Sequence, residues 1–449
     1  MSRQLIVATD TGIVGQLEFE SHDERFMFRY DDAWLARADA FPLSPHIPLG
    51  PHAPASGVMQ RFLSNLLPEG RALDVASVVN QISKDNVFGL VHVLGREPVG
   101  GLGFLPVADD GAAPVQSREA VRRAIPHAEL SERIRDRDTI PFPVWDRKVR
   151  LSVAGYQDKL QVLIEGEHIA LADGALSSTH LLKPESRNMS TPHMVANEHF
   201  CMTLAARMGL PVAPVSLWRI PEPLLLVERF DRSVTRDPTT GLVHTVRRLH
   251  VIDACQALDA PVSYKYERNF GNNESVANIR EGVSFATLFP LARQCEDPAH
   301  ARALLVRWAM FHLLIGNSDA HGKNLSFFMR RSGLAPAPFY DLVSVNVYGA
   351  GVEQDMAMGY GDAFRIDDVT AFALADFAQR TGIPASYLSR DLRRMADSAM
   401  NAAAELAGSD MYIGEERMLV REIAGFVTRQ AQHLQHVAPM IPAAFKSLL

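Results

Sequence analysis

The most constraining feature of this sequence is an apolar run, LLVRWAMFHLLI, at residues 304–315, which is followed at once by the polar cluster GNSDAHGKN. Its large apolar residues recur at steps of four, three and four: Leu304, Trp308, Phe311 and Ile315. This spacing is that of one buried face of an α-helix, and a glycine directly after the run is typical of a helix end. The sequence therefore predicts a buried helix whose end presents a short polar loop, residues 318–324, on a rigid base.

The composition is that of a folded protein with more than one compact unit. The chain has 449 residues, of which 47% are apolar and 22% are charged. A formal net charge of −7 gives no basic excess with which the chain alone would hold nucleic acid. Three cysteines stand far apart without a CxxC pair, which argues against a disulfide framework and a zinc site. No uncharged apolar run approaches the ~18 residues that span a membrane, so we expect a soluble, cytoplasmic protein.

The order of strand-like and helix-like segments predicts an α+β fold. Residues 1–105 form an N-terminal α+β subdomain that opens with two strand-like runs around a turn at Asp10-Thr11-Gly12. Residues 106–150 begin with a Gly- and Pro-containing stretch and are interpreted as a linker. Residues 151–235 give two strand-like runs, a helix and a third strand-like run, and residues 236–449 are mainly helical. Three amphipathic helices are predicted near the end of the chain, within residues 367–382, 384–406 and 415–437.

Three oxygen-bearing side chains follow the buried helix. Asp319 and Asn324 lie five positions apart in the polar loop. We expect LSFFMR and PFYD to form a hairpin-like pair of short strands that delivers Asp341 to the same place. Magnesium prefers a few hard oxygen ligands, and phosphoryl transfer also needs a carboxylate that accepts the proton of the attacking hydroxyl. Because the spacing Asp, four residues, Asn is that of protein-kinase catalytic loops, we predict Asp319 as the base and Asn324 and Asp341 as metal ligands.

Taken alone, this cluster also has simpler explanations. Asp and Asn commonly cap a turn, and His321 suggests a metal hydrolase, although no second histidine stands at ligand spacing. Other segments favour a nucleotide site. Lys183 ends a strand-like run, and Glu198 lies fifteen residues later in a predicted helix, where it can hold the lysine toward ATP by an ion pair. Each residue alone is as well explained by an exposed lysine and an unrelated helix glutamate.

Two further stretches fit a nucleotide site less specifically. SVAGYQDK, residues 152–159, can cover a phosphate with its backbone N–H groups, although a single glycine between strands is more often a hairpin turn. LLLVERFD, residues 224–231, would be the edge strand and hinge against which adenine stacks. Phe230 is then the ring contact, and its alternative role is core packing.

With these pieces in order, the sequence closely resembles the HipA-type serine/threonine kinases, the toxin halves of bacterial toxin–antitoxin modules. The matching stretches occur in family order over nearly the whole chain: NLLPEGRA, GLGFLPV, SVAGYQDK, STHLLKP, NEHFCMTLA, VERFDR, CQALDAPVSYKYE, LIGNSDAHGKNLSFF and PFYDLVS. The resemblance implies a protein-kinase-like α+β fold with a small N-terminal subdomain and a largely helical C-terminal lobe.

The resemblance also implies roles for individual residues. Asp319 is expected to be the catalytic base, Asn324 and Asp341 the Mg²⁺ ligands, Lys183 the ATP lysine, and Ser152 a site of autophosphorylation that switches the enzyme off. The nucleotide-binding positions implied by the matching stretches are Ser152, Val153, Ala154, Gly155, Lys183, Glu198, Glu228, Phe230, Asp231, His321 and Lys323. Tyr156 departs from the pattern by placing a bulky ring inside the phosphate loop.

The family resemblance extends to partners. It implies an antitoxin of HipB type, a helix-turn-helix dimer through which operator DNA is contacted indirectly, and an aminoacyl-tRNA synthetase as the protein substrate. The polar residues 184–197 are expected to meet that substrate, or to be an idle loop. Two alternatives stay open at this point: a small-molecule kinase of similar fold, and a non-catalytic corepressor that acts with a HipB-like antitoxin.

Overall fold

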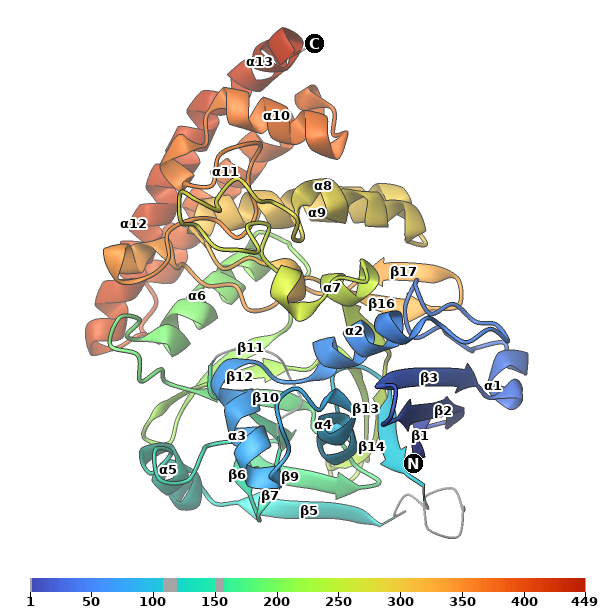
Figure 1. Ribbon diagram of the computed structural model, residues 1–449. Coiled ribbons are helices and arrows are strands. Elements are labelled where there is room, and N and C mark those ends of the chain that lie inside the picture. Colours follow the sequence, from blue (N-terminus) through green and yellow to red (C-terminus); the bar gives the residue numbers. More distant parts are fainter. Residues whose placement is uncertain (1, 108–118, 151–156, 449) are drawn as a thin grey trace. The chain divides into compact units, whose positions relative to one another are not determined.

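The structure is a computed structural model that describes residues 2–107, 119–150 and 157–448 (Figure 1). These residues form two compact units, each built from several stretches of the chain. Unit 1 consists of Met1–Pro184, Trp218–Val262 and Phe327–Gly333, and unit 2 consists of Glu185–Leu217, Ser263–Ser326 and Leu334–Leu449. Unit 1 contains most of the strands and unit 2 contains the long helices, so the expected α+β fold with a helical C-terminal part is confirmed.

The N-terminal part of unit 1 is a four-stranded antiparallel sheet in the order β3-β2-β1-β4. Its strands are β1 (Ser2–Thr9), β2 (Gly12–Glu20), β3 (Arg25–Tyr30) and β4 (Gly103–Pro106). The predicted turn joins β1 to β2, and the Thr9 hydroxyl accepts the Thr11 N–H and donates to the Gly12 carbonyl. Four helices accompany the sheet: α1 (Asp32–Ala36), α2 (Ser56–Leu66), α3 (Gly70–Asn80) and α4 (Val87–Leu94).

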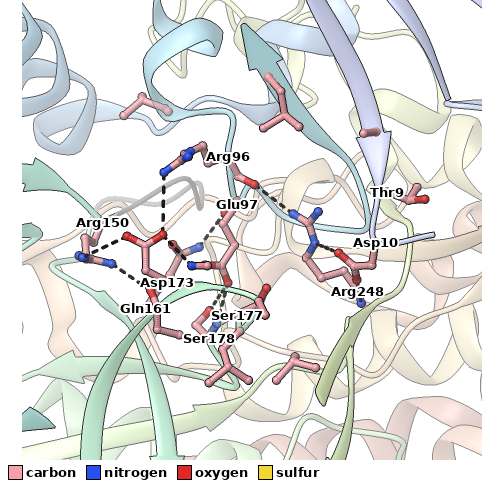
Figure 2. Close-up of a pocket in the computed structure, with 18 of the residues that line it drawn as sticks. Thr9, Asp10, Arg96, Glu97, Arg150, Gln161, Asp173, Ser177, Ser178 and Arg248 are labelled. Atoms are coloured by element: carbon pink, nitrogen blue, oxygen red, sulfur yellow. Dashed lines mark hydrogen bonds and ion pairs between the residues drawn. The ribbon is translucent and has the colours of Figure 1, made fainter. Parts of the chain in front are cut away.

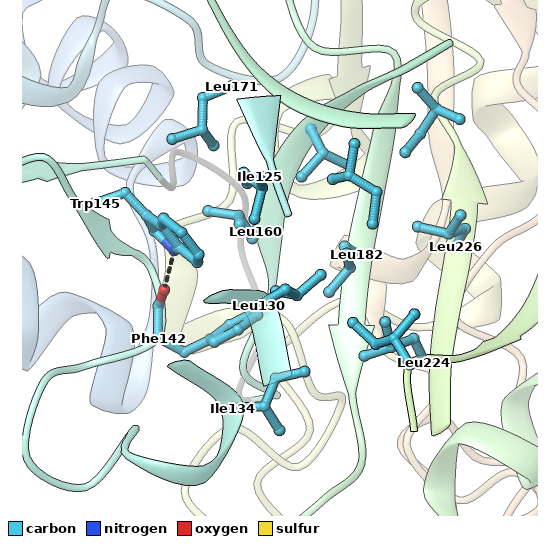
Figure 3. Packing of buried hydrophobic residues seen from close by; sticks show 14 residues of the cluster. Ile125, Leu130, Ile134, Phe142, Trp145, Leu160, Leu171, Leu182, Leu224 and Leu226 are labelled. Carbon is cyan, nitrogen blue, oxygen red and sulfur yellow. Dashed lines mark hydrogen bonds between the residues drawn. The ribbon is translucent and has the colours of Figure 1, made fainter. Parts of the chain in front are cut away.

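Five neighbouring strands of a second sheet also lie in unit 1, in the order β12-β10-β8-β9-β5. They are β5 (Ala120–Ile125), β8 (Leu160–Glu165), β9 (His168–Gly174), β10 (His180–Pro184) and β12 (Pro223–Glu228). In the sheet, β11 (Val215–Arg219) is the neighbour of β12 on its other side. Because side chains alternate across a strand, Leu160, Val162 and Leu182 face one core. Helix α5 (His127–Arg135) and the hairpin of β6 (Val144–Trp145) and β7 (Lys148–Val149) cover this core, with the Trp145 ring packed into it (Figure 3).

The stretch interpreted as a linker thus contains regular structure in its described part. Strand β5 pairs with β9 along its whole length, and α5 contributes Leu130 and Ile134 to the core in Figure 3. The opposite face of the sheet packs Leu163 and Ala170 against residues of β14. The remaining elements of unit 1 are β13 (Arg232–Arg236), β14 (Val243–Arg248), β15 (Val251–Asp253) and α7 (Ala254–Ala257).

Unit 2 is organised around α9 (Pro298–Ile315), the helix predicted from the apolar run. Asp297 caps its first turn by accepting the His300 N–H, and Gly316 ends it with a left-handed φ of 64°. The predicted stripe is buried, and α11 and α12 pack against α9 (Figure 1). The other α-helices of the unit are α6 (Met194–Arg207), α8 (Phe285–Leu288), α10 (Ala371–Thr381), α11 (Ala385–Ala407), α12 (Gly414–Val437) and α13 (Ile441–Leu448). Among the described residues, no helix combines the length and apolarity required to cross a membrane.

The short strands after α9 differ in part from expectation. LSFFMR forms β16 (Ser326–Arg330), but its partner is β17 (Gly333–Pro336), so the prediction that PFYD is the second strand is wrong. Pro336 is the last residue of β17, and Pro338 has no N–H with which the ladder could continue toward PFYD. Phe339 instead makes an isolated bridge to Val212, and this bridge fixes the backbone two residues before Asp341.

A buried ionic network joins the N-terminal sheet to the second sheet within unit 1. Asp231 accepts hydrogen bonds from Arg229 at 2.8 and 3.0 Å, from Arg232 at 2.8 Å and from the Gly100 N–H at 2.8 Å. Glu97 lies 3.4 Å from the Arg232 guanidinium and accepts the Ser178 hydroxyl at 2.6 Å. Residues before 105 are therefore fastened to residues after 150 by charge-assisted hydrogen bonds.

This ionic network, which is called the joint below, borders a cavity of about 1440 Å³ (Figure 2). Arg248 closes one end by an ion pair with Asp10 at 2.8 Å. At the other end Asp173 lies 3.3 to 3.9 Å from three cations, those of Arg96, Lys148 and Arg150. Two of these ion pairs, Arg248 with Asp10 and Arg96 with Asp173, connect residues before 105 with residues after 150.

Electrostatics keep the network charged at neutral pH. Burial alone would raise the pKa values of Asp231 and Glu97, but the charges of Arg229 and Arg232 outweigh burial and lower both. Burial, reinforced by the neighbouring Arg229, lowers the pKa of Arg232 to about 10. Arg229, which holds Asp231 with two hydrogen bonds, has a raised pKa despite its burial.

We predict that Asp231→Asn destabilises the protein by about 3–5 kcal/mol at pH 7, because it leaves two buried guanidinium groups without their shared carboxylate. Since the pKa of Asp231 is lowered on folding, its contribution is fully present above the unfolded value of about 3.9. It declines progressively as the pH falls from there toward the lower folded value. Urea unfolding at pH 7 and pH 3.5 should show a difference between wild type and variant that shrinks at the lower pH.

The matched control is Asp39→Asn, which removes the partner of Arg37 from an exposed ion pair of the same unit. That variant should change the free energy of unfolding far less, because water screens an exposed pair. Equal effects of the two substitutions would contradict the structural role of Asp231.

Candidate active site

The end of α9 presents the loop that carries Asp319. Gly316 has a left-handed backbone, and a Cβ there would lie 2.5 Å from the Phe426 ring, so the turn requires glycine. The Asn317 side chain accepts the Asp319 N–H at 3.0 Å, and the Ser318 carbonyl accepts the Ala357 N–H at 2.8 Å. Asp319 is exposed whereas the residues on either side of it are buried. The loop therefore displays one carboxylate from a fixed backbone.

Asn324 is tied directly to the residue predicted as the base. Its side-chain amide nitrogen donates to the Asp319 carbonyl at 3.2 Å, and its backbone N–H donates to the His321 carbonyl at 2.9 Å. The amide group is thus oriented by its nitrogen, which makes the amide oxygen the atom suited to a cation. Asn324 and Asp319 are brought together by one turn of 3₁₀ helix, Gly322–Asn324.

His321 is a buried, neutral histidine that caps this turn. Its Nδ1 accepts the Lys323 N–H at 3.2 Å, which assigns the ring proton to Nε2. Burial lowers the pKa of His321 well below its usual value, and the charge of Lys265 lowers it further, whereas the charge of Asp341 opposes the shift. Asp341, Lys265 and Lys323 therefore all lie near the loop that carries Asp319.

Asp341 has a strained backbone that its neighbours hold in place. Its φ is +57°, in the left-handed region that a residue other than glycine rarely adopts. Before it, the Tyr340 hydroxyl donates to the Lys323 carbonyl at 2.6 Å, and after it, Asn197 of α6 makes two hydrogen bonds to the backbone of Ser344, at 2.8 and 2.9 Å. Strain of this kind clusters at functional sites, where the surrounding structure maintains it.

The donor set suits magnesium. The Asp341 carboxylate and the Asn324 amide oxygen are hard oxygen donors on segments that Tyr340 ties together. Magnesium keeps several non-protein oxygens in its coordination sphere, so two protein ligands are sufficient for it.

The residues predicted to contact the nucleotide lie in different parts of the chain. Lys183 of β10 is 4% exposed and points to the face of its sheet opposite Leu182. Glu198 lies on α6 in unit 2 and is also buried. The phosphate loop, with Ser152, Val153, Ala154, Gly155 and Tyr156, lies outside the described residues. Their predicted contacts to ATP, and the ion pair of Lys183 with Glu198, stay predictions.

The predicted hinge divides into exposed and buried parts. Glu228 is exposed at the end of β12, and Phe230 is half-buried with its ring edge-on to Phe328 at 6.1 Å. Asp231, in contrast, is occupied by the ionic network of unit 1, which favours a structural role for it over a contact with the nucleotide.

Four residues that support Asp319 and Asp341 were not singled out from the sequence: Asn197, Lys265, Tyr266 and Asn317. The Tyr266 hydroxyl donates to Asp319 Oδ1 at 2.6 Å, although 53 residues separate the two in the chain. All four residues fall inside stretches that carry the family resemblance: NEHFCMTLA, CQALDAPVSYKYE and LIGNSDAHGKNLSFF. That resemblance was the available signal, because periodicity does not reveal a polar contact over this separation.

Comparison with known proteins agrees with this architecture. The HipA N-terminal domain model matches residues 5–105, and the HipA-like C-terminal domain model matches residues 151–405. The serine/threonine-protein kinase toxin HipA of Shewanella oneidensis is 41% identical over 88% of this chain and 87% of its own length. The putative kinase Y4mE of Sinorhizobium fredii is 33% identical over 93% of this chain and 95% of its own length.

A solved structure confirms the predicted HipA-type, kinase-like fold. A chain in the complex of HipA, HipB and operator DNA from Shewanella oneidensis matches with a TM-score of 0.87 and 37% identity. The match covers 98% of this chain and 99% of the other. The two family models, the identity to the toxin and the shared fold agree, and the chain therefore belongs to the HipA family of serine/threonine-protein kinases.

Proposed function

We propose that this protein is a Mg-ATP-dependent serine/threonine protein kinase that acts as the toxin of a toxin–antitoxin module. The observation that carries the proposal is the exposed Asp319 carboxylate on a fixed loop, with Asn324 bonded to its carbonyl and Asp341 nearby. Phosphoryl transfer depends mainly on positioning and on charge stabilisation, and this site offers both.

In the proposed reaction each residue has one task. Asp319 accepts the proton of the substrate hydroxyl, whose oxygen bonds to the γ-phosphorus of ATP while the bond to the leaving ADP breaks. Asn324 and Asp341 hold Mg²⁺, which when bound neutralises charge on the phosphate oxygens. Lys183 binds the phosphates, and Lys323, the neighbour of Asn324, adds positive charge beside the acceptor.

Ser152 is the proposed off-switch. Its phosphorylation adds about −1.5 to −2 charges to the loop that covers ATP. That charge repels the phosphates of the nucleotide, so the loop leaves its position and ATP binding fails. The proposal rests on the match of SVAGYQDK to the family's phosphate loop.

The proposed partner is a HipB-like helix-turn-helix antitoxin in the cytoplasm. The related HipA was solved with HipB and operator DNA, which supports such a complex for this chain. A net charge of −7 supports contact with operator DNA through the antitoxin rather than by this chain alone. The proposed substrate is an aminoacyl-tRNA synthetase, met by residues 184–197.

The first test is autophosphorylation. Purified protein is treated with phosphatase and then given Mg-ATP, and intact mass and phosphopeptides are recorded for the wild type, Ser152→Ala and Asp319→Asn. We expect one phosphate on Ser152 of the wild type and none on either variant. Turnover of small alcohols without any protein acceptor would favour a small-molecule kinase instead. Absence of transfer by a form that binds ATP would favour the non-catalytic corepressor.

The partner proposal has a separate test. The reading frames beside this chain's gene are searched for a small helix-turn-helix protein. That protein is mixed with its operator fragment, and this chain is added in a gel-shift assay. We expect this chain to retard the fragment further only when the antitoxin is present. Asp319→Asn should behave like the wild type, because binding does not need the chemistry. Retardation of the operator by this chain alone would contradict the proposal.

A further inference from the structure

Tyr266 makes a short contact with the proposed catalytic base. Its hydroxyl donates to Asp319 Oδ1 at 2.6 Å, which is the length of a charge-assisted hydrogen bond. Both residues belong to unit 2, where Asp319 is exposed and Tyr266 is half-buried. The hydrogen bond therefore restrains an exposed carboxylate that would otherwise rotate freely in water.

The backbone around Tyr266 is held on both sides. Val283 N–H donates to the Tyr264 carbonyl at 2.8 Å, and Gly282 N–H donates to the Glu267 carbonyl at 3.2 Å. A Cβ at Gly282 would lie 1.8 Å from the Tyr266 carbonyl oxygen, so only glycine permits this approach. Tyr266 thus lies in an irregular segment whose backbone is held by hydrogen bonds on both sides.

The same segment is bonded to the loop that carries Asp319. The Gly322 N–H donates to the Lys265 carbonyl at 2.9 Å. Ala357 joins the two from a third segment, because its N–H donates to Ser318 at 2.8 Å and its carbonyl accepts the Glu267 N–H at 3.0 Å. Tyr266 and Asp319 therefore share one backbone frame, and neither can shift without the other.

Ring contacts fix the direction of the Tyr266 hydroxyl. The His321 ring meets the Tyr266 ring edge-on, with centroids 5.0 Å apart and planes at 88°. The Lys265 ammonium lies 5.3 Å from the same ring centroid in a cation–π contact. These neighbours limit rotation of the ring, so the hydroxyl stays directed at the carboxylate.

We propose that Tyr266 is a positioning residue, which holds the Asp319 carboxylate in the orientation that accepts the substrate proton. The inference rests on the proposed kinase function. An aspartate side chain rotates about two bonds, and a hydrogen bond to one oxygen from a fixed donor restricts both rotations. A misplacement of about 1 Å can lower a rate by about 100-fold, so loss of this restraint should slow transfer without weakening ATP binding.

The test compares Tyr266→Phe with Tyr264→Phe. The first removes only the hydroxyl that contacts Asp319, and the second removes a hydroxyl two residues away that donates to exposed Glu281 at 3.3 Å. Single-turnover phosphorylation at saturating ATP, the ATP dissociation constant and Tm are measured for both. We expect about a 10-fold slower transfer for Tyr266→Phe, with ATP affinity near wild type and a small, resolvable loss of Tm from the lost hydrogen bond, and no change for Tyr264→Phe.

Three results would overturn the inference. An unchanged rate means that the hydroxyl has no part in positioning. A faster rate means that Tyr266 occupies the place of the acceptor hydroxyl and obstructs it. Parallel losses of rate, ATP affinity and Tm mean that the residue only supports the fold.

A double-mutant cycle separates this inference from the proposed function. Tm is measured for Tyr266→Phe, Asp319→Ala and the double variant, which requires no activity. We expect shifts that do not add, because either single substitution already removes the shared hydrogen bond. If the wild type transfers no phosphate while the shifts are non-additive, the kinase proposal fails and the contact stands. If the wild type is active and the shifts add, the inference alone fails.

Discussion

The helix α9 is the constraint on which unit 2 depends. It is buried along most of its length, so its end is fixed, and the left-handed turn at Gly316 sends the chain directly into the loop of Asp319. A carboxylate that must meet a reacting hydroxyl needs a fixed origin, and a helix packed in the core provides one. Further hydrogen bonds hold the loop after the helix, from Asn317 and Tyr266 to Asp319 and from Ala357 to Ser318.

Unit 1 achieves rigidity by different means. A hydrophobic core covers one face of its second sheet, whereas the joint to the N-terminal sheet is ionic. Buried ion pairs are geometrically specific, since a guanidinium and a carboxylate meet well in few orientations. The joint is therefore held by hydrogen bonds of defined geometry.

The local parts of this structure could be predicted from the sequence. The stripe of α9, the turn at Asp10-Thr11-Gly12 and the spacing of Asp319 and Asn324 each involve neighbours in the chain, and periodicity or turn chemistry reveals such features. Contacts between distant residues could not be read in this way. Tyr266 reaches Asp319 across 53 residues, and the pairing of Asp231 with Arg229 and Arg232 follows no local pattern. The prediction that PFYD is a strand fails because β17, Gly333–Pro336, pairs with β16 instead.

The backbone of Asp341 has a consequence for how such a protein evolves. A left-handed φ of +57° is unfavourable for aspartate, less so for asparagine and not at all for glycine. Replacement of Asp341 by glycine, which would remove the metal ligand proposed there, is thus a substitution that the local backbone accepts readily. At Asp341, loss of the proposed metal ligand and relief of backbone strain would therefore coincide. If Asp341 has the proposed role, a lineage would lose the proposed activity by one substitution and would still keep a folded chain.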